Sequence, residues 1–240
     1  MLIGPISEAG RQFDYDTRPL FAVDGPSFCT LVGAAPEAGP GAFARYGVAC
    51  PAKVARSAPA RQVDYLLGRL CARVAVRRFD PGFAGDIPAG PNREPVFPAG
   101  LSGSITHTDG YVAAVCQGIR AGTVGLDAET LLSPDQAAEI GPSFAAADEI
   151  ACPGWGKTPP ETRYSLVFSA KEAAYKALFP WVRSVLPFDA ARLVRVNLDH
   201  QTLSLGLAPR GDVRLPGTLE IRFRVDAGRV VTFAVVRPRV

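Results

Sequence analysis

The sequence has few of the residues that build common metal and redox centres. Its 240 residues include only two histidines, His107 and His200, and five cysteines without any C-x-x-C pair. Two histidines exclude a multi-histidine metal site. An odd number of widely spaced cysteines argues against a zinc site and a disulfide framework. We therefore expect a protein of a reducing compartment.

Phosphate-loop signatures and membrane segments are also missing. Neither G-x-x-x-x-G-K-[ST] nor G-x-G-x-x-G occurs, so the P-loop and Rossmann interpretations lack their signatures. The longest apolar runs, such as 230–236, are too short to cross a bilayer. Residues 1–16 lack the basic and apolar regions of a secretory signal. These features predict a cytoplasmic protein that does not span a membrane.

The composition is that of a globular chain, with 48% hydrophobic and 20% charged residues. Its length allows one large domain or two modest ones. The net charge of +3 conceals a basic segment, residues 45–78, where eight lysines and arginines accompany one acid, Asp64. Arginine-rich segments favour anionic ligands, and phosphate above all, because the guanidinium group matches phosphate geometry.

Hydrophobic periodicity predicts a first long helix that begins near Arg61. Apolar residues recur there at helical spacing, and Arg69, Arg73 and Arg77 follow at intervals of four. These three arginines form a basic stripe. The stripe is either a solvated helix face or a phosphate contact, and the spacing alone does not decide between them.

A second long helix is predicted over residues 162–179, with Pro180 ending it. This segment is apolar almost all round, which is typical of a buried helix. Lys171, Glu172 and Lys176 lie within it, and buried charges need partners. The alternative is a surface Glu172–Lys176 pair that adds a few tenths of a kcal/mol to helix stability.

Alternating patterns elsewhere predict antiparallel strands. A hairpin signal, Asp109-Gly110, separates two apolar runs, and residues 1–58 suggest short strands joined by loops. A capping box at 133–136 predicts a further short helix. Each half of the chain runs from helices to hairpins, so we predict two similar lobes, 1–120 and 121–240. The predicted later strands are 194–198, 203–207, 219–225 and 230–236.

Two carboxylates near the midpoint suggest a cation site. The apolar run 123–126 predicts a buried strand, and residues two apart on a strand share a face, so Asp127 and Glu129 project together. Like charges held that close repel unless a cation or water neutralises them, and Mg²⁺ prefers such oxygen ligands. Glu172, between two lysines, offers a third carboxylate. The alternative is a solvated strand end with two surface acids.

Two motifs at this spacing resemble those of the 4′-phosphopantetheinyl transferases. Residues 125–129 (GLDAE) match G-[IV]-D-x-E, and residues 168–176 (FSAKEAAYK) match [FW]-S-x-K-E-[AS]-x-x-K. Upstream, 95–98 (PVFP) and 103–108 (GSITHT) are similar to P-x-W-P and G-S-[IL]-S-H-[ST]. With Gly68-Arg69, the chain resembles the larger, pseudo-dimeric branch of enterobactin-synthase and surfactin type. Mild departures are Leu126, Phe97 and Thr106.

This resemblance implies an α+β (α/β) fold of two similar lobes related by a pseudo-twofold axis, with the active site in the cleft between them. The lobe of residues 1–120 would bind the 3′-phosphate side of coenzyme A. The lobe of residues 121–240 would hold the metal and the pyrophosphate.

The resemblance also implies residue roles. Asp127, Glu129 and Glu172 would hold Mg²⁺ against the pyrophosphate of coenzyme A. Glu172 or a metal-bound water would be the base, and Lys176 would stabilise charge on the leaving phosphate. The residues expected to bind coenzyme A are Lys171, Lys176, Thr106 and His107, helped by Arg56, Arg93 and more weakly Arg69.

The implied activity is transfer of the 4′-phosphopantetheine arm of coenzyme A to a serine hydroxyl of an apo-carrier protein. The carrier would be an acyl, peptidyl or aryl carrier of a siderophore or other nonribosomal pathway, and 3′,5′-ADP would be released. We expect a monomer without a nucleic-acid partner. Two alternatives stay open: a non-catalytic binder of coenzyme A or nucleotide, and a Mg²⁺-dependent phosphodiesterase that uses water.

Overall fold

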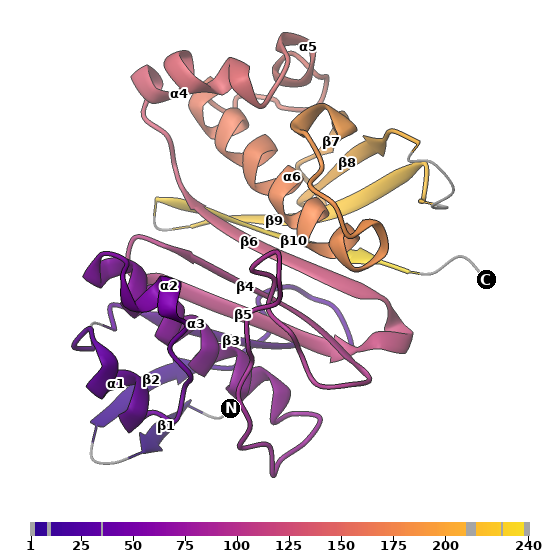
Figure 1. Cartoon of the computed structure of the whole chain (residues 1–240). Helices are drawn as coiled ribbons and strands as arrows, with labels where there is room; N and C mark the ends of the chain where they lie inside the picture. Colours follow the sequence, from indigo (N-terminus) through magenta and orange to yellow (C-terminus); the bar gives the residue numbers. More distant parts are fainter. Residues whose placement is uncertain (1–2, 9–10, 35, 210–214, 227, 238–240) are drawn as a thin grey trace. The chain divides into compact units, whose positions relative to one another are not determined.

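The structure, a computed structural model, describes residues 3–8, 11–34, 36–209, 215–226 and 228–237 (Figure 1). The chain divides into two compact units, Met1–Ala121 and Gly122–Val240, called unit 1 and unit 2 below. Each unit contains a five-stranded antiparallel sheet and one long helix, which confirms the predicted α+β class. The pseudo-twofold axis and the cleft stay predictions. Within the described ranges, no helix is long and apolar enough to cross a membrane.

In unit 1 the strand order is β1-β2-β3-β5-β4. The predicted hairpin is confirmed, because β4 pairs with β5 and Asp109 and Gly110 form the turn with φ of 30° and 70°. The long helix α3 packs its apolar stripe on β3, β4 and β5. The elements are β1 (Ile3–Glu8), β2 (Arg11–Asp16), β3 (Ser27–Val32), α1 (Pro40–Arg45), α2 (Ala52–Ala55), α3 (Pro59–Val76), β4 (Leu101–Thr108), β5 (Tyr111–Gly118) and the 3-10 turn Ile119–Ala121.

The basic stripe of α3 has a structural use that neither sequence interpretation included. Arg73 is buried and donates to the carbonyl oxygens of Tyr46 and Gly47 at 2.9 and 2.7 Å. Arg77 donates to the carbonyl of Phe83 at 3.0 Å. These two arginines therefore fasten loops to the helix, because buried carbonyls need donors and a long side chain can reach them.

In unit 2 the strand order is β6-β10-β9-β8-β7, and the predicted closing strands are confirmed. The helix α6 lies across the sheet and packs most extensively on β6 and β10 (Figure 1). The predicted capping box is confirmed at the start of α4. The elements are β6 (Thr123–Thr130), α4 (Pro134–Ile140), the 3-10 turn Gly141–Ser143, α5 (Ala147–Ile150), α6 (Pro160–Val182), the 3-10 turn Phe188–Ala190, β7 (Ala191–Asn197), β8 (Thr202–Leu207), β9 (Thr218–Asp226) and β10 (Arg229–Val236).

The prediction that Pro180 ends the second long helix was wrong, since α6 continues to Val182. A proline in the last turn removes only one helical hydrogen bond, and the chain is stopped instead by Arg183. That residue adopts a left-handed φ of 47°, and its N–H donates to the carbonyl of Phe179 at 2.8 Å.

Gly125 sets how closely α6 approaches β6. A Cβ built on this residue would lie 1.9 Å from the carbonyl oxygen of Ala173 and 2.7 Å from the nitrogen of Ala177. Any side chain would therefore push the helix backbone away from the strand. Asp127 is two residues further along β6 on the same face, so this close contact brings its carboxylate against α6.

Candidate active site

Asp127 lies at the contact between the two motifs. Its carboxylate is almost fully buried, at 2% exposure, on the face of β6 that α6 covers. Its Oδ1 accepts a hydrogen bond from Lys176 Nζ at 2.6 Å, and its Oδ2 accepts one from Ser169 Oγ at 2.8 Å. Lys176 Nζ also donates to the carbonyl of Leu126 at 3.2 Å. The strand motif and the helix motif thus meet through charged hydrogen bonds, as buried charges require.

Glu172 is part of the same electrostatic group. Burial raises the pKa of this carboxyl, the nearby Lys176 ammonium lowers it, and the negative charge of Asp127 raises it further. The net effect is a pKa above the ordinary value. The carboxylates of Glu172 and Asp127 and the ammonium of Lys176 therefore act on each other in a partly desolvated environment. This environment makes Glu172 a more basic proton acceptor than an exposed glutamate.

Glu129 follows Asp127 by two residues on β6, on the same face by alternation, and is partly exposed. No group of three or more His, Cys, Asp or Glu side chains in the described part of the chain is arranged to hold a metal ion. At Asp127 Oδ1 the positive charge is that of Lys176. The metal-binding roles of Asp127, Glu129 and Glu172 therefore stay predictions. Their hard carboxylate oxygens are nevertheless the donor type that Mg²⁺ prefers.

Lys171, which was expected to bind phosphoryl oxygens, is engaged elsewhere. Its ammonium is buried, lies 3.0 Å from the carboxylate of Glu149 and donates to the carbonyl of Phe144 at 2.8 Å. The same carboxylate accepts from the backbone N–H groups of Ala146 and Leu193 at 2.9 and 2.7 Å. A contact with a phosphoryl oxygen would require Lys171 to leave these partners, and the predicted role stays a prediction.

In unit 1, His107 lies on β4 beside two residues of α3 that were absent from the predicted site. Arg61 Nη1 lies 2.5 Å from His107 Nε2, and Asp64 Oδ2 lies 3.5 Å from His107 Nδ1. Arginine can only donate, so Nε2 accepts and the ring proton lies on Nδ1, toward Asp64. The sequence does suggest that Arg61 and Asp64 share one helix face, because they are three residues apart in the basic segment. The sequence did not show that this helix face meets β4.

The other predicted residues of unit 1 differ in burial. Arg69 is buried, with its guanidinium carbon 4.2 Å from the centre of the Tyr65 ring. Desolvation lowers its pKa, and its Nε has no hydrogen-bond partner among the described residues. Thr106 is buried on β4. Arg56 and Arg93 are exposed, at the end of α2 and in a turn with φ of 71°.

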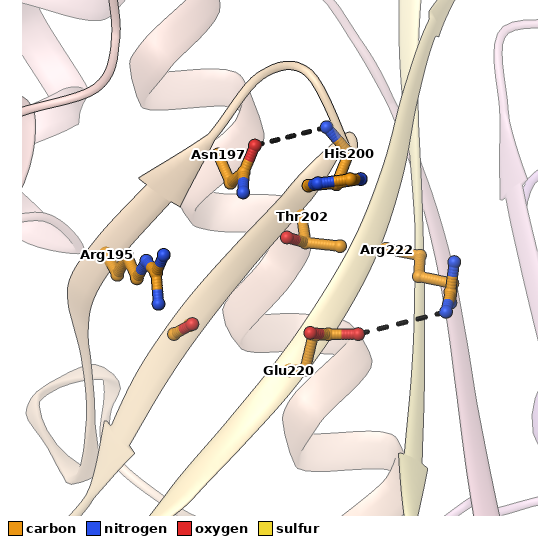
Figure 2. Close-up of a pocket in the computed structure, with 7 residues that line it drawn as sticks. Arg195, Asn197, His200, Thr202, Glu220 and Arg222 are labelled. Atoms are coloured by element: carbon orange, nitrogen blue, oxygen red, sulfur yellow. Dashed lines mark hydrogen bonds and ion pairs between the residues drawn. The ribbon is translucent and has the colours of Figure 1, made fainter.

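A polar trough of about 260 Å³ crosses the outer face of β7, β8 and β9 (Figure 2). Its floor is formed by the short side chains of β8, and longer side chains on β7 and β9 form the walls. Leucines 203 and 205 alternate with the floor residues and pack in the core with α6, so the trough lies on the opposite face of the sheet. It contains no predicted site residue. The lining residues are Arg195, Asn197, His200, Thr202, Ser204, Glu220 and Arg222.

Comparisons with known proteins agree with the motifs. The family model described as "4'-phosphopantetheinyl transferase N-terminal domain" matches residues 50–117, and that of the "4'-phosphopantetheinyl transferase superfamily" matches residues 123–227. Enterobactin synthase component D of Salmonella typhi is 36% identical over 146 residues, which cover 60% of this chain and 59% of the relative. The chain thus spans about three fifths of that protein.

Two other relatives are covered more fully. The 4′-phosphopantetheinyl transferase Svp of Streptomyces mobaraensis is 34% identical over 195 residues, or 78% of this chain and 77% of the relative. The 4′-phosphopantetheinyl transferase PptT of Mycobacterium tuberculosis is 34% identical over 206 residues, or 76% and 82%. The motifs, the two sheet-and-helix units and these matches lead to one conclusion: the chain belongs to the 4′-phosphopantetheinyl transferase superfamily, in the branch that resembles enterobactin synthase component D.

Proposed function

We propose that the chain transfers the 4′-phosphopantetheine arm of coenzyme A to a serine hydroxyl of an apo-carrier protein and releases 3′,5′-ADP. One observation carries the proposal: Asp127 of the strand motif accepts hydrogen bonds from Ser169 and Lys176 of the helix motif, 42 and 49 residues further along the chain. The names of the relatives support the same activity. Phosphoryl transfer depends on positioning and charge neutralisation, which fixed charges provide.

The reaction is proposed to depend on Mg²⁺, held by Asp127, Glu129 and Glu172. The fit rests on donor chemistry, because these are hard oxygen ligands and Asp127 already pairs with a cation, Lys176. When bound, the ion would neutralise negative charge on the pyrophosphate of coenzyme A. Asp127 is buried, whereas Glu129 and Glu172 are both partly exposed.

Glu172 and Lys176 are the proposed catalytic residues. The serine hydroxyl of the carrier attacks the β-phosphorus of coenzyme A, so a serine O–P bond forms and the bond from that phosphorus to the bridging oxygen breaks. The hydroxyl proton passes to the Glu172 carboxylate, whose raised pKa suits a proton acceptor. The bridging oxygen leaves with 3′,5′-ADP, and the Lys176 ammonium stabilises the charge that develops on phosphate.

Unit 1 is proposed to bind the 3′-phosphate of coenzyme A. His107 and Arg61 lie together, and Arg61 brings a guanidinium group suited to phosphate. The unpartnered Nε of the buried Arg69 supports a role for that residue, because a buried donor without a partner costs free energy. Arg56, Arg93 and Thr106 complete the proposed set.

The test is a transfer assay read by intact mass. The protein is incubated with coenzyme A, Mg²⁺ and a panel of apo-acyl, peptidyl and aryl carriers, and each carrier is weighed. Transfer adds the phosphopantetheine mass to one or more carriers, and the preferred carrier identifies the pathway class. A phosphodiesterase would release free phosphopantetheine, and a binder would produce neither. The control is a carrier whose acceptor serine is alanine, which must stay unmodified.

The predictions of a monomeric and cytoplasmic enzyme belong to the same proposal. Size-exclusion chromatography with light scattering measures the first, and fractionation of cells that express the protein measures the second. A stable dimer would contradict the monomer without affecting the proposed chemistry.

A further inference from the structure

Thr232 is the residue of β10 that lies directly opposite Asp127 of β6. It is fully buried, at 0% exposure, and it lies 63 residues after Ser169. It also lies beyond the residues 123–227 that the superfamily model matches, and outside both sequence motifs. Directly opposed residues of an antiparallel pair share a face, so Thr232 faces α6 as Asp127 does.

Four oxygen atoms from three residues form a buried chain at this point. Ser169 Oγ lies 2.8 Å from Asp127 Oδ2 and 2.8 Å from Thr232 Oγ1, and Thr232 Oγ1 lies 2.8 Å from the carbonyl oxygen of Ser169. Ser169 itself is 0% exposed. Groups this well buried interact in a low dielectric, where each hydrogen bond strengthens the next.

The proton count gives the chain one direction. An ionised carboxylate can only accept, so the single proton of the Ser169 hydroxyl points to Asp127 Oδ2. Ser169 Oγ is then the acceptor toward Thr232, and the Thr232 hydroxyl is the donor. Thr232 has a single hydroxyl proton, which is shared between two acceptors of Ser169, its Oγ and its carbonyl oxygen. Thr232 therefore holds Ser169 in the orientation that donates to Asp127.

We propose that Thr232 is a positioning residue for Asp127 and acts through Ser169. This inference rests on the proposed function, because it concerns the affinity of the Asp127 carboxylate for a divalent cation. Lys176 holds Oδ1 and Ser169 holds Oδ2, so the carboxylate plane is fixed from both ends. Residues that hydrogen-bond metal ligands typically change metal affinity about 10- to 100-fold when they are replaced.

Thr123 provides a matched control on the same sheet and helix. It is also a buried threonine on the pair of β6 and β10, and its hydroxyl donates to the carbonyl of Ala177 in α6 at 2.6 Å. It accepts from Trp181 Nε1 at 2.7 Å and belongs to no proposed site. A variant without the Thr123 hydroxyl therefore shows how much stability is lost when a buried threonine hydrogen bond to α6 is removed and Asp127 keeps its partners.

The experiment compares the full chain with Thr232→Val, Thr232→Ser and Thr123→Val. The Kd for Mn²⁺ alone is measured from the EPR signal of free Mn²⁺, and the transfer assay gives the Mg²⁺ activation constant and kcat at saturating Mg²⁺. We expect Thr232→Val to raise both metal constants about 10-fold or more, while kcat at saturating Mg²⁺ changes less. Thr232→Ser keeps the hydroxyl donor, so both of its metal constants should stay within about 3-fold of those of the parent chain. Thr123→Val should lower Tm and leave the metal constants unchanged.

Two results would overturn the inference: an unchanged Mn²⁺ Kd in Thr232→Val, or an equal loss in Thr123→Val. If Thr232→Val does not fold, Thr232→Ala removes the same hydroxyl, and Thr232→Ser shows whether the hydroxyl or the methyl group matters. A parent chain that neither binds Mn²⁺ nor modifies a carrier would overturn the proposed function together with this inference. A parent chain that does both, beside a Thr232→Val variant equal to it, overturns the inference alone.

Discussion

The two units of the chain share one order of elements. In unit 1 a strand, a long helix and a hairpin follow as β3, α3, β4 and β5. In unit 2 the same order is β6, α6, β9 and β10, with β7 and β8 inserted after the helix. In both units the strand before the helix pairs with the last strand of the unit, and that strand pairs with the one before it.

The units differ in what the strand before the long helix presents to that helix. The strand β3 presents Cys29 and Leu31, which pack in an apolar core with α3. The strand β6 presents Gly125, which admits the helix backbone, and Asp127, which accepts from two side chains of α6. Both units have an apolar core, but the contact of this strand with its helix is apolar in unit 1 and includes a buried charged contact in unit 2, because one strand position carries an acid.

The largest expected effect is on catalysis. Asp127→Asn keeps the shape of the side chain but removes the charge that Lys176 and the proposed Mg²⁺ require, so the transfer rate should fall about 10³-fold or more. Asp64→Asn is the matched change in unit 1, next to His107. It should alter KM for coenzyme A by less than about 10-fold, because it acts on binding alone. Steady-state transfer kinetics with both variants measure the difference, and equal losses would contradict it.

The second comparison tests the two helix contacts through stability. Gly125→Ala forces a Cβ against helix backbone and should cost about 3 kcal/mol or more in the free energy of unfolding. Gly68→Ala in α3 meets only the Cγ2 methyl group of Ile105, at 2.8 Å, and no backbone atom outside its own helix within 4 Å. The gain in helix propensity, about 1 kcal/mol, offsets much of that crowding. Urea unfolding of both variants measures the two losses of stability. A Gly68→Ala variant less stable than Gly125→Ala would refute the closer helix contact described at Gly125.

The third comparison separates two arginines of α3. Arg73→Met removes the donors to two backbone carbonyls and should cost about 2 kcal/mol of stability with little change in KM for coenzyme A. Arg69→Met should do the reverse, raising KM while unfolding changes less, because its Nε has no partner to lose in the described structure. Thermal unfolding and coenzyme A kinetics on both variants give the answer. An Arg69→Met variant with unchanged KM would remove Arg69 from the proposed site.

The smallest effect concerns the pH dependence of stability at Glu172. Its folded pKa is raised, chiefly by burial, so the folded chain holds this proton more tightly than the unfolded chain does. Stability then falls as pH rises from the unfolded pKa to the folded pKa, and the penalty is complete above the folded pKa. Glu172→Gln should therefore raise Tm at neutral pH in metal-free buffer, and the gain should vanish below about pH 4. A gain that is constant with pH would contradict a raised pKa.

Local features of the sequence predicted much of this. The alternation of β6 placed Asp127 and Glu129 on one face, the hairpin signal located the β4–β5 turn, and the capping box located α4, because these patterns involve neighbouring residues. Chemistry also predicted that the charges of the second long helix would need partners. The error at Pro180 arose because a rule about one residue was applied to a helix whose end depends on Arg183.

Tertiary structure alone decided which partners those charges found. Lys171 pairs with Glu149, Lys176 with Asp127, and Arg73 with the carbonyls of a loop, across separations of 22 to 49 residues. Thr232 meets Ser169 across 63 residues. Periodicity tells which face of an element is buried, but it does not tell which other element covers that face. The residue types of the site were therefore present in the sequence, and tertiary packing chose their contacts, through α6 on β6 and β10 in unit 2 and α3 on β4 in unit 1.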